Sequence, residues 1–166
     1  SAFLKAVTTK KMGTYLALSN LGATPFEQLL GHNLAILDAW NRLELSLFTA
    51  SGLDSHLLEQ VRRTLAFGNQ CEYCMVKAGR ADTELADSRT SVAVAFAALF
   101  VADHTSITRQ HFAILGQEFN DREISALCAF ITFISASQRL GRICNLTEEY
   151  QLTKTTTMGV LQAGVR

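Results

Sequence analysis

The chain has 166 residues, of which 48% are hydrophobic, and its 15 Lys and Arg balance its 15 Asp and Glu. Because the basic residues form no block that could neutralise a phosphate backbone, the composition argues against a nucleic-acid-binding protein. The longest apolar run, over residues 92–102, is shorter than the roughly 20 residues that a membrane-spanning helix needs. We therefore expect neither nucleic acid nor a membrane as a partner.

A single Pro among many Ala and Leu residues is typical of a helical protein. We expect an all-α protein of about six or seven helices, with an N-terminal segment over 1–24 and one helical domain over 25–146. The tail over 147–166 is predicted to be poorly ordered or docked on a neighbouring subunit. A chain of this length buries a core without disulfide staples and starts with no convincing signal peptide, so we expect a reducing cytoplasm.

The first two helices are marked by Pro, Gly and apolar spacing. Pro25 can open a short helix over 26–30, which Gly31 would end. A longer amphipathic helix is predicted next, ending at Gly52, because four large apolar residues recur at helical spacing: Ile36, Trp40, Leu43 and Leu47.

Asp54 is a good N-cap for the following helix. Three apolar residues at helical spacing predict its buried stripe: Leu58, Val61 and Leu65. The Gly68-Asn69 pair is a helix-stop signal. A new helix is therefore predicted from Cys71 to about Arg80.

Three helices are predicted in the C-terminal half. A strongly apolar helix covers about 88–102, and a shorter one over 108–115 ends at a Gly. The last and longest begins at a capping box that pairs Asn120 with Glu123. Cys128 lies beside the apolar stripe of that helix, so we expect its thiol to belong to the core.

The C-x-x-C motif of Cys71 and Cys74 is the part of the sequence that indicates chemistry. Two thiols three positions apart lie one turn apart on a helix, so they can form and break a disulfide. A thiol at a helix N-terminus also ionises more readily than a free one. A structural zinc site needs four ligands, and the sequence has no second C-x-x-C or H-x-x-H pair, so we expect no metal and no organic cofactor.

Glu59 lies twelve positions before Cys71, and this combination resembles the carboxymuconolactone decarboxylase / AhpD-like (alkylhydroperoxidase) family. The likeness covers roughly residues 25–145. Other segments that resemble the family are Leu30–Asn33 with Trp40, Leu53–Val61, and Phe119–Ile124 with Gln138–Leu140. The resemblance implies an AhpD-like helical domain that assembles as a homo-oligomer, commonly a trimer or hexamer, with the dithiol near subunit contacts.

The resemblance also implies roles for individual residues. Cys74 would be the peroxidatic thiol, Cys71 the resolving thiol, and Glu59 part of a proton relay. The peroxidases of the family complete this relay with a His four positions after the second Cys, where this chain has Ala78. As written in this sequence, the relay therefore lacks its His.

Nearby side chains could substitute for that His. Lys77 is three positions after Cys74 on the predicted helix, and an ammonium group near the thiol would favour the thiolate. His56 shares a helix face with Glu59 and could complete a different relay. Glu59 could instead be a solvated residue or pair with a neighbouring Arg. Candidates with weaker support are His104, His111 and Tyr73.

We therefore expect a thiol-dependent antioxidant oxidoreductase that reduces hydroperoxides or disulfides and is itself reduced by an external dithiol. One alternative is a decarboxylase of the carboxymuconolactone type, which would need a cationic clamp for a small lactone acid and no Cys pair. The other alternative is a non-catalytic helical oligomer with a decayed site, which Ala78 favours.

Overall fold

The computed structural model describes residues 13–79, 81–82 and 87–146, and every regular element among them is a helix. The predicted all-α fold is therefore confirmed, while the tail over 147–166 lies outside the described residues. The elements are α1 (Pro25–Leu30), α2 (Leu34–Thr49), α3 (Ser55–Gly68), α4 (Glu72–Ala78), α5 (Ser88–Asp103), the 3-10 helix η1 (His104–Ser106), α6 (Arg109–Glu118) and α7 (Asp121–Ile143).

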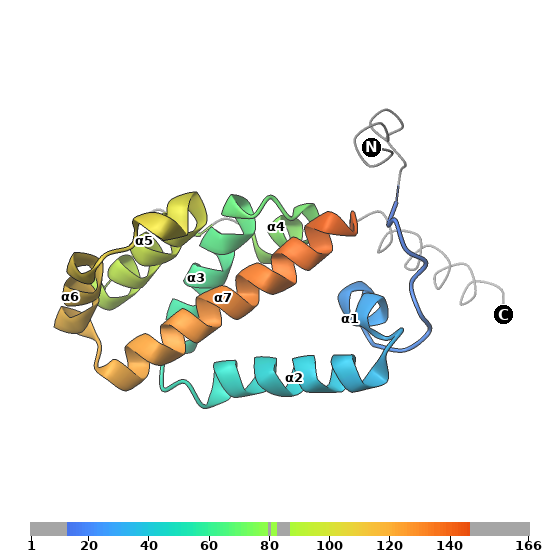
Figure 1. The fold of residues 1–166 in the computed structure, drawn as a ribbon, viewed down its shortest axis with the longest axis horizontal. Coiled ribbons are helices and arrows are strands. Elements are labelled where there is room, and N and C mark those ends of the chain that lie inside the picture. The colour runs from blue at the N-terminus through green and yellow to red at the C-terminus, as the bar shows by residue number, and fades with distance from the viewer. Residues whose placement is uncertain (1–12, 80, 83–86, 147–166) are drawn as a thin grey trace, which may run out of the picture.

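Helix α7 is the longest element and crosses the molecule diagonally (Figure 1). It packs on α3 and contacts α2, α4 and α6, while α5 packs on α3 and α6. Helix α2 runs along the opposite side of α7 from α5 and α6 (Figure 1). By length and composition α7 could cross a membrane, but half of its apolar window is buried inside the protein.

Side-chain caps explain where the helices begin. The Asp54 carboxylate accepts backbone N–H bonds from the first turn of α3, as predicted. Asn120 and Glu123 form the predicted capping box of α7, and Thr24 and Glu27 form another at α1. Each such cap stabilises its helix by about 1 kcal/mol, so these short polar signals fix the helix starts locally.

The main core lies where α3, α5 and α7 meet. Leu58, Val61 and Leu65 of α3 are completely buried, which confirms the predicted stripe. Helices α3 and α5 approach closely at Gly68, where a Cβ atom would collide with the Val101 side chain. Other buried residues of this core include Ala93, Phe96, Leu127, Phe130, Ile131 and Ile134, with Cys128 half-buried against them.

Helix α2 has a different inward face from the one that the apolar spacing predicted. Ile36 and Leu43 are about half exposed, at 49% and 50%. The residues that face the protein are Leu37, Trp40 and Leu47, and the indole N–H of Trp40 reaches α7 at 3.2 Å from a Ser hydroxyl. The inward face of α2 is therefore rotated about the helix axis relative to the predicted apolar stripe, because neighbouring elements cover only one side of the helix.

The segment before α1 is irregular and packs beside the C-terminal end of α7. The backbone N–H of Tyr15 donates to the carbonyl of Cys144 at 2.9 Å, and that of Ser19 donates to Gln28 at 3.0 Å. The described part of the N-terminal segment thus reaches the Cys pair, because Leu18 packs against the buried cluster that contains Cys71.

Candidate functional site

The Cys pair stands at a sharp turn between two helices. Helix α3 ends at Gly68, and Gln70 has the left-handed φ of 54° that reverses the chain. Cys71 then caps α4, with its sulfur accepting the backbone N–H of Cys74 at 3.4 Å. Helix α4 is shorter than predicted, because Gly79 adopts a φ of 70° directly after Ala78 and ends it.

Cys71 and Cys74 form a disulfide, and their Cα atoms are 5.1 Å apart, within the ordinary range for such a bond. The two sulfur-bearing residues differ in their access to solvent. Cys71 is completely buried, whereas Cys74 is only partly buried. A reagent that approaches from solution therefore meets Cys74 first.

The backbone of α7 covers Cys71. A Cβ atom added at Gly141 would lie 3.1 Å from the Cys71 sulfur, so a side chain there would press on it. Tyr73 and Leu146 complete a small buried cluster around Cys71, with Phe26 packed against it. This apolar cover leaves the second sulfur of the disulfide as the accessible one.

A pocket of about 80 Å³ opens beside Cys74. It lies between helices that are far apart in the sequence: α2, α3, α4 and α7, with one aromatic ring from α1. Its walls combine one thiol-bearing residue with two basic and one acidic side chain. The lining residues are Phe26, Glu44, Arg62, Tyr73, Cys74, Lys77, Ile134, Ser137 and Gln138.

Two polar residues of α7 form a fixed wall of this pocket. Gln138 is buried and donates to the backbone carbonyl of Arg62 at 3.1 Å, while its carbonyl accepts from Asn69 at 3.0 Å. The hydroxyl of Ser137 accepts from Trp40 and donates to the backbone of α7. These bonds tie α2 and α3 to α7, so the pocket is held by three long helices.

Glu59 binds neighbouring Arg residues. Its carboxylate accepts two hydrogen bonds from Arg62, at 2.8 and 2.7 Å, and one from Arg63 at 3.0 Å. Burial alone would raise the pKa of Glu59, but the hydrogen bonds and charges of the two Arg residues outweigh it and lower the pKa below its ordinary value. Of the three, Arg62 lines the pocket, so Glu59 holds the guanidinium group of a pocket-lining residue.

Lys77 lines the same pocket as Cys74, so the helical spacing does bring these two residues together. Its ammonium nitrogen lies 5.9 Å from the centre of the Tyr73 ring, a cation–π distance. Tyr73 is buried and also lines the pocket, so it both packs and borders the approach to the disulfide. Ala78, at the position of the missing His, is buried at the end of α4.

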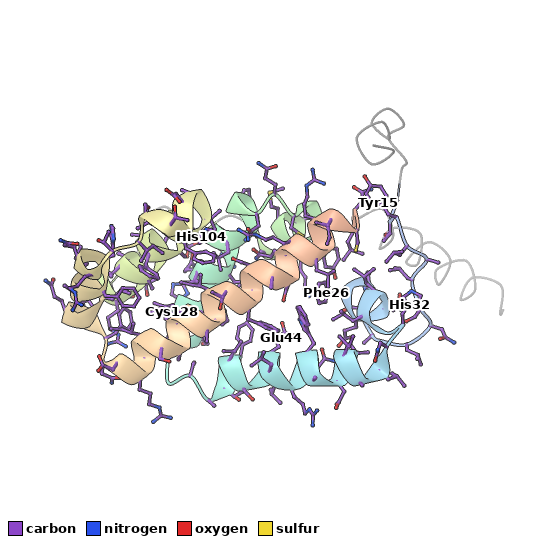
Figure 2. The ribbon with its side chains drawn as sticks, viewed as in Figure 1. Tyr15, Phe26, His32, Glu44, His104 and Cys128 are labelled. Atoms are coloured by element: carbon purple, nitrogen blue, oxygen red, sulfur yellow. A yellow bond between two sulfur atoms is a disulfide. The ribbon has the colours of Figure 1, made fainter. Side chains whose placement is uncertain are left out.

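Glu44 of α2 was not predicted from the sequence as a site residue. Figure 2 shows this side chain on the side of α2 that faces α7, where it lines the pocket. The residue as a whole is exposed, but its carboxyl group lies against the pocket, and burial raises its pKa above the ordinary value; Lys77 opposes that rise. Its position could have been found from its register with the inward residues Trp40 and Leu47, had the correct face of α2 been known.

The three candidate His residues lie elsewhere. His56 is exposed in the first turn of α3, and it lies 12 positions before the C-terminal end of the helix, about 18 Å. His104 follows α5, with its ring 5.9 Å from that of Phe100. His111 lies in the first turn of α6.

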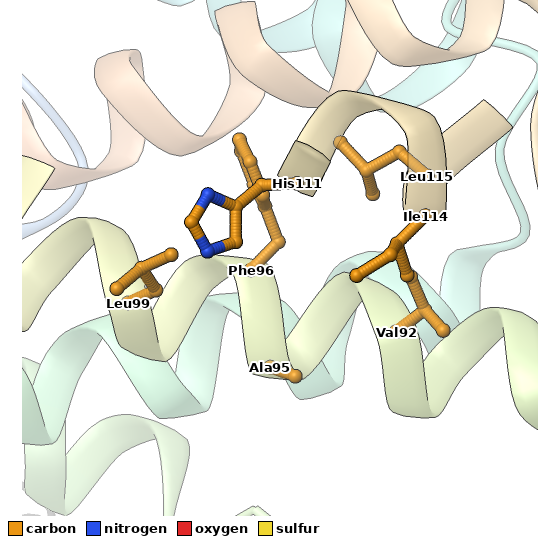
Figure 3. Close-up of a pocket in the computed structure, with 7 residues that line it drawn as sticks. All are labelled: Val92, Ala95, Phe96, Leu99, His111, Ile114 and Leu115. Atoms are coloured by element: carbon orange, nitrogen blue, oxygen red, sulfur yellow. The ribbon is translucent and has the colours of Figure 1, made fainter. Parts of the chain in front are cut away.

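A second pocket, of about 130 Å³, lies between α5 and α6 (Figure 3). His111 is the single polar residue among those that line it, and its ring nitrogen accepts the backbone N–H of Thr108 at 2.9 Å. Its lining contains no thiol: Val92, Ala95, Phe96, Leu99, His111, Ile114 and Leu115. Among the described residues, no three His, Cys, Asp or Glu side chains gather as a metal site would require.

The fold is shared with a protein of known structure. The crystal structure of an uncharacterised peroxidase-related protein from Silicibacter sp. TM1040 matches with a TM-score of 0.71 and 18% identity, covering 84% of this chain and 93% of that one. Comparisons with family models and with curated proteins gave no match. The likeness agrees with the expected AhpD-like helical fold and, at this identity, establishes the fold alone.

Proposed function

We propose that this protein is a thiol-dependent oxidoreductase that reduces hydroperoxides, with Cys74 as the attacking thiol and Cys71 as the resolving thiol. The observation that carries this proposal is the asymmetric disulfide: Cys74 borders a charged pocket, and Cys71 is buried beneath α7. The peroxidase-related protein that shares the fold supports the same class of reaction coarsely.

The proposed reaction starts from the reduced pair. The Cys74 thiolate attacks one oxygen of the hydroperoxide, the O–O bond breaks, and the departing alkoxide takes up a proton to leave as an alcohol. Cys74 is then a sulfenic acid. The Cys71 sulfur attacks it, the S–O bond breaks, and the released hydroxide combines with the Cys71 proton to form water.

The disulfide that results must be reduced before the next cycle. An external dithiol attacks the accessible Cys74 sulfur, forms a mixed disulfide and leaves oxidised, which returns both thiols of the pair. A bulky protein dithiol needs an exposed target, and partial exposure of Cys74 provides one. This step requires no bound metal or organic cofactor.

Two cations in the pocket favour the attacking thiolate. The positive charges of Arg62 and Lys77 lower the free energy of a negative sulfur relative to a neutral thiol. Glu59 acts on this step through Arg62, because its bidentate bond fixes the guanidinium group. Glu59 is thus a positioning residue in this proposal, and the sequence-based suggestion that it carries protons is replaced.

A decarboxylase acting on a small lactone acid is the second candidate. Arg62 and Lys77, which line the same pocket, would suit a substrate carboxylate, which is the cationic clamp that this chemistry needs. A spectroscopic lactone assay tests this candidate directly. Turnover of the lactone that survives Cys74→Ser would favour the decarboxylase over the oxidoreductase.

We also propose that the protein assembles as a homo-oligomer, a trimer or hexamer, in the cytoplasm. Four large apolar side chains on α2 are at least 49% exposed, and their spacing places them in two pairs on opposite flanks of the helix, where contact with another subunit would remove them from water. They are Leu34, Ile36, Leu43 and Leu45. Light scattering of the purified chain tests the assembly, and a monomeric mass would contradict it.

The decisive experiment is a single turnover of the reduced protein with tert-butyl hydroperoxide, followed by intact mass spectrometry. We expect a loss of two hydrogens per chain as the disulfide forms. Cys74→Ser should abolish this change, whereas Cys128→Ser, which removes a thiol packed against the main core, should leave it intact. A wild-type chain that keeps both hydrogens, or a Cys74→Ser chain that still loses them, would overturn the proposal.

A further inference from the structure

We propose that Glu44 of α2 is the proton carrier of this site, taking the proton from the Cys74 thiol and returning it to the alkoxide that leaves. This inference rests on the proposed reduction of hydroperoxides and adds a catalytic residue to it. It places the proton carrier on α2, because Ala78, which stands where the relay His is expected, has no titratable group.

The position of Glu44 follows from the register of α2. Trp40 and Leu47 lie four positions before and three positions after it, and both face the protein. These spacings place the three side chains on one face of the helix. Glu44 is the acidic member of that inward face, and it lines the cavity beside Cys74.

Charged groups from each neighbouring helix act on this carboxyl group. Lys77 of α4 and Arg62 of α3 stabilise its ionised form, while Glu27 of α1 disfavours it. From α7 the pocket receives only neutral side chains, and from α4 it also receives the phenol of Tyr73. Burial is the largest influence and raises the pKa of Glu44, which moves the carboxyl closer to the neutral pH at which a proton carrier works best.

The proton transfers balance within one turnover. The Glu44 carboxylate accepts the proton of the Cys74 thiol, and the thiolate attacks the hydroperoxide. When the O–O bond breaks, the sulfur has gained one oxygen and lost two electrons, and the alkoxide takes the proton from Glu44. The carboxylate is then regenerated, so no further acid or base is consumed before Cys71 forms the disulfide.

The direction in which Glu44→Gln changes the reaction rate distinguishes a proton carrier from a carboxylate that acts only by charge repulsion. A carboxylate that only repels would raise the pKa of the Cys74 thiol, so its removal would speed the reaction near neutral pH. A carboxyl that carries the proton gives the opposite result. We expect Glu44→Gln to slow single-turnover disulfide formation with tert-butyl hydroperoxide by about 100-fold at neutral pH.

The pH profile provides the second readout. In the wild type, the rate should rise with pH through the ionisation of the coupled carboxyl–thiol pair and then reach a plateau. Glu44→Gln should lose this plateau and keep rising with pH toward the ordinary thiol range, because only hydroxide then removes the proton. A structural defect would lower the rate at every pH without changing the profile.

Asp38→Asn is the matched control. Asp38 lies on the exposed side of α2, where it pairs with Arg42 at 3.1 Å. Removing its charge changes the same helix by one carboxylate, and we expect the rate to stay within about twofold of the wild type.

The possible failures are distinguishable. If the wild type forms no disulfide with the hydroperoxide, the proposed function fails. If the wild type reacts and Glu44→Gln reacts equally fast or faster, or keeps the wild-type pH profile, the function stands and the role of Glu44 is refuted.

Discussion

The two pockets of this domain show how differently the same kind of helical packing can be used. The pocket beside Cys74 is bordered by a disulfide, two cations and a carboxylate, whereas the pocket between α5 and α6 is larger but apolar apart from His111. Volume therefore does not identify the site. The charged side chains that three helices, α2, α3 and α4, contribute to its lining do identify the site.

The pockets also differ in how many helices form their walls. Beside Cys74, hydrogen bonds from Gln138 and Ser137 join α7 to α2 and α3. The lining of the other pocket comes from two helices, α5 and α6. A reacting thiol needs fixed neighbours, because a charge or proton carrier is effective only at a defined position.

The largest further effect is expected from the bond between Glu59 and Arg62. Glu59→Gln removes the carboxylate that holds the guanidinium group, so we expect single-turnover oxidation by tert-butyl hydroperoxide to slow by about fivefold to tenfold, with the assembly unchanged. Arg62→Lys should slow it similarly. If Glu59 acts through Arg62, the double variant should be no slower than the slower single variant; effects that multiply would show an independent role for Glu59.

A pair of Gly→Ala substitutions compares the stability of the two regions. Gly141→Ala places a methyl group 3.1 Å from the buried Cys71 sulfur, so we expect it to lower the free energy of unfolding by about 1–3 kcal/mol. Gly116→Ala in α6, with no heavy atom within 4 Å of the added Cβ, should raise it by about 0.5–1 kcal/mol.

Urea unfolding of the oxidised protein measures both changes. Because both Gly residues are helical, the gain in helix propensity is shared, and the difference between the variants isolates the contact with Cys71. Equal effects would mean that α7 does not press on that sulfur.

The smallest effect is expected at the apolar pocket. His111→Gln keeps a side-chain acceptor at the third position of α6, where Gln suits a capping box, so stability should hardly change. The rate of oxidation by the hydroperoxide should stay within about twofold of the wild type, since α4 lies elsewhere. A strong loss of activity in this variant would mean that the chemistry takes place at the apolar pocket.

The candidate site was only partly predictable from the sequence. The spacing of Cys71 and Cys74 and the position of Lys77 three residues after Cys74 follow from the sequence, and the structure brings these residues to one turn and one pocket. For Glu59 the sequence left open a bond to a nearby Arg, and the structure shows that bond. Glu44 was missed because the apolar residues of α2 suggested a different buried face.

Local signals in the chain were enough for the all-helical class, for the helix starts at Asp54 and Asn120, and for a dithiol one turn apart, because caps and short spacings depend on neighbouring residues only. Packing alone decided which sulfur is buried and which acidic group borders the other. Those outcomes depend on how α2 and α7 lie against α4, and residues far apart in the chain are brought together only by the core they share.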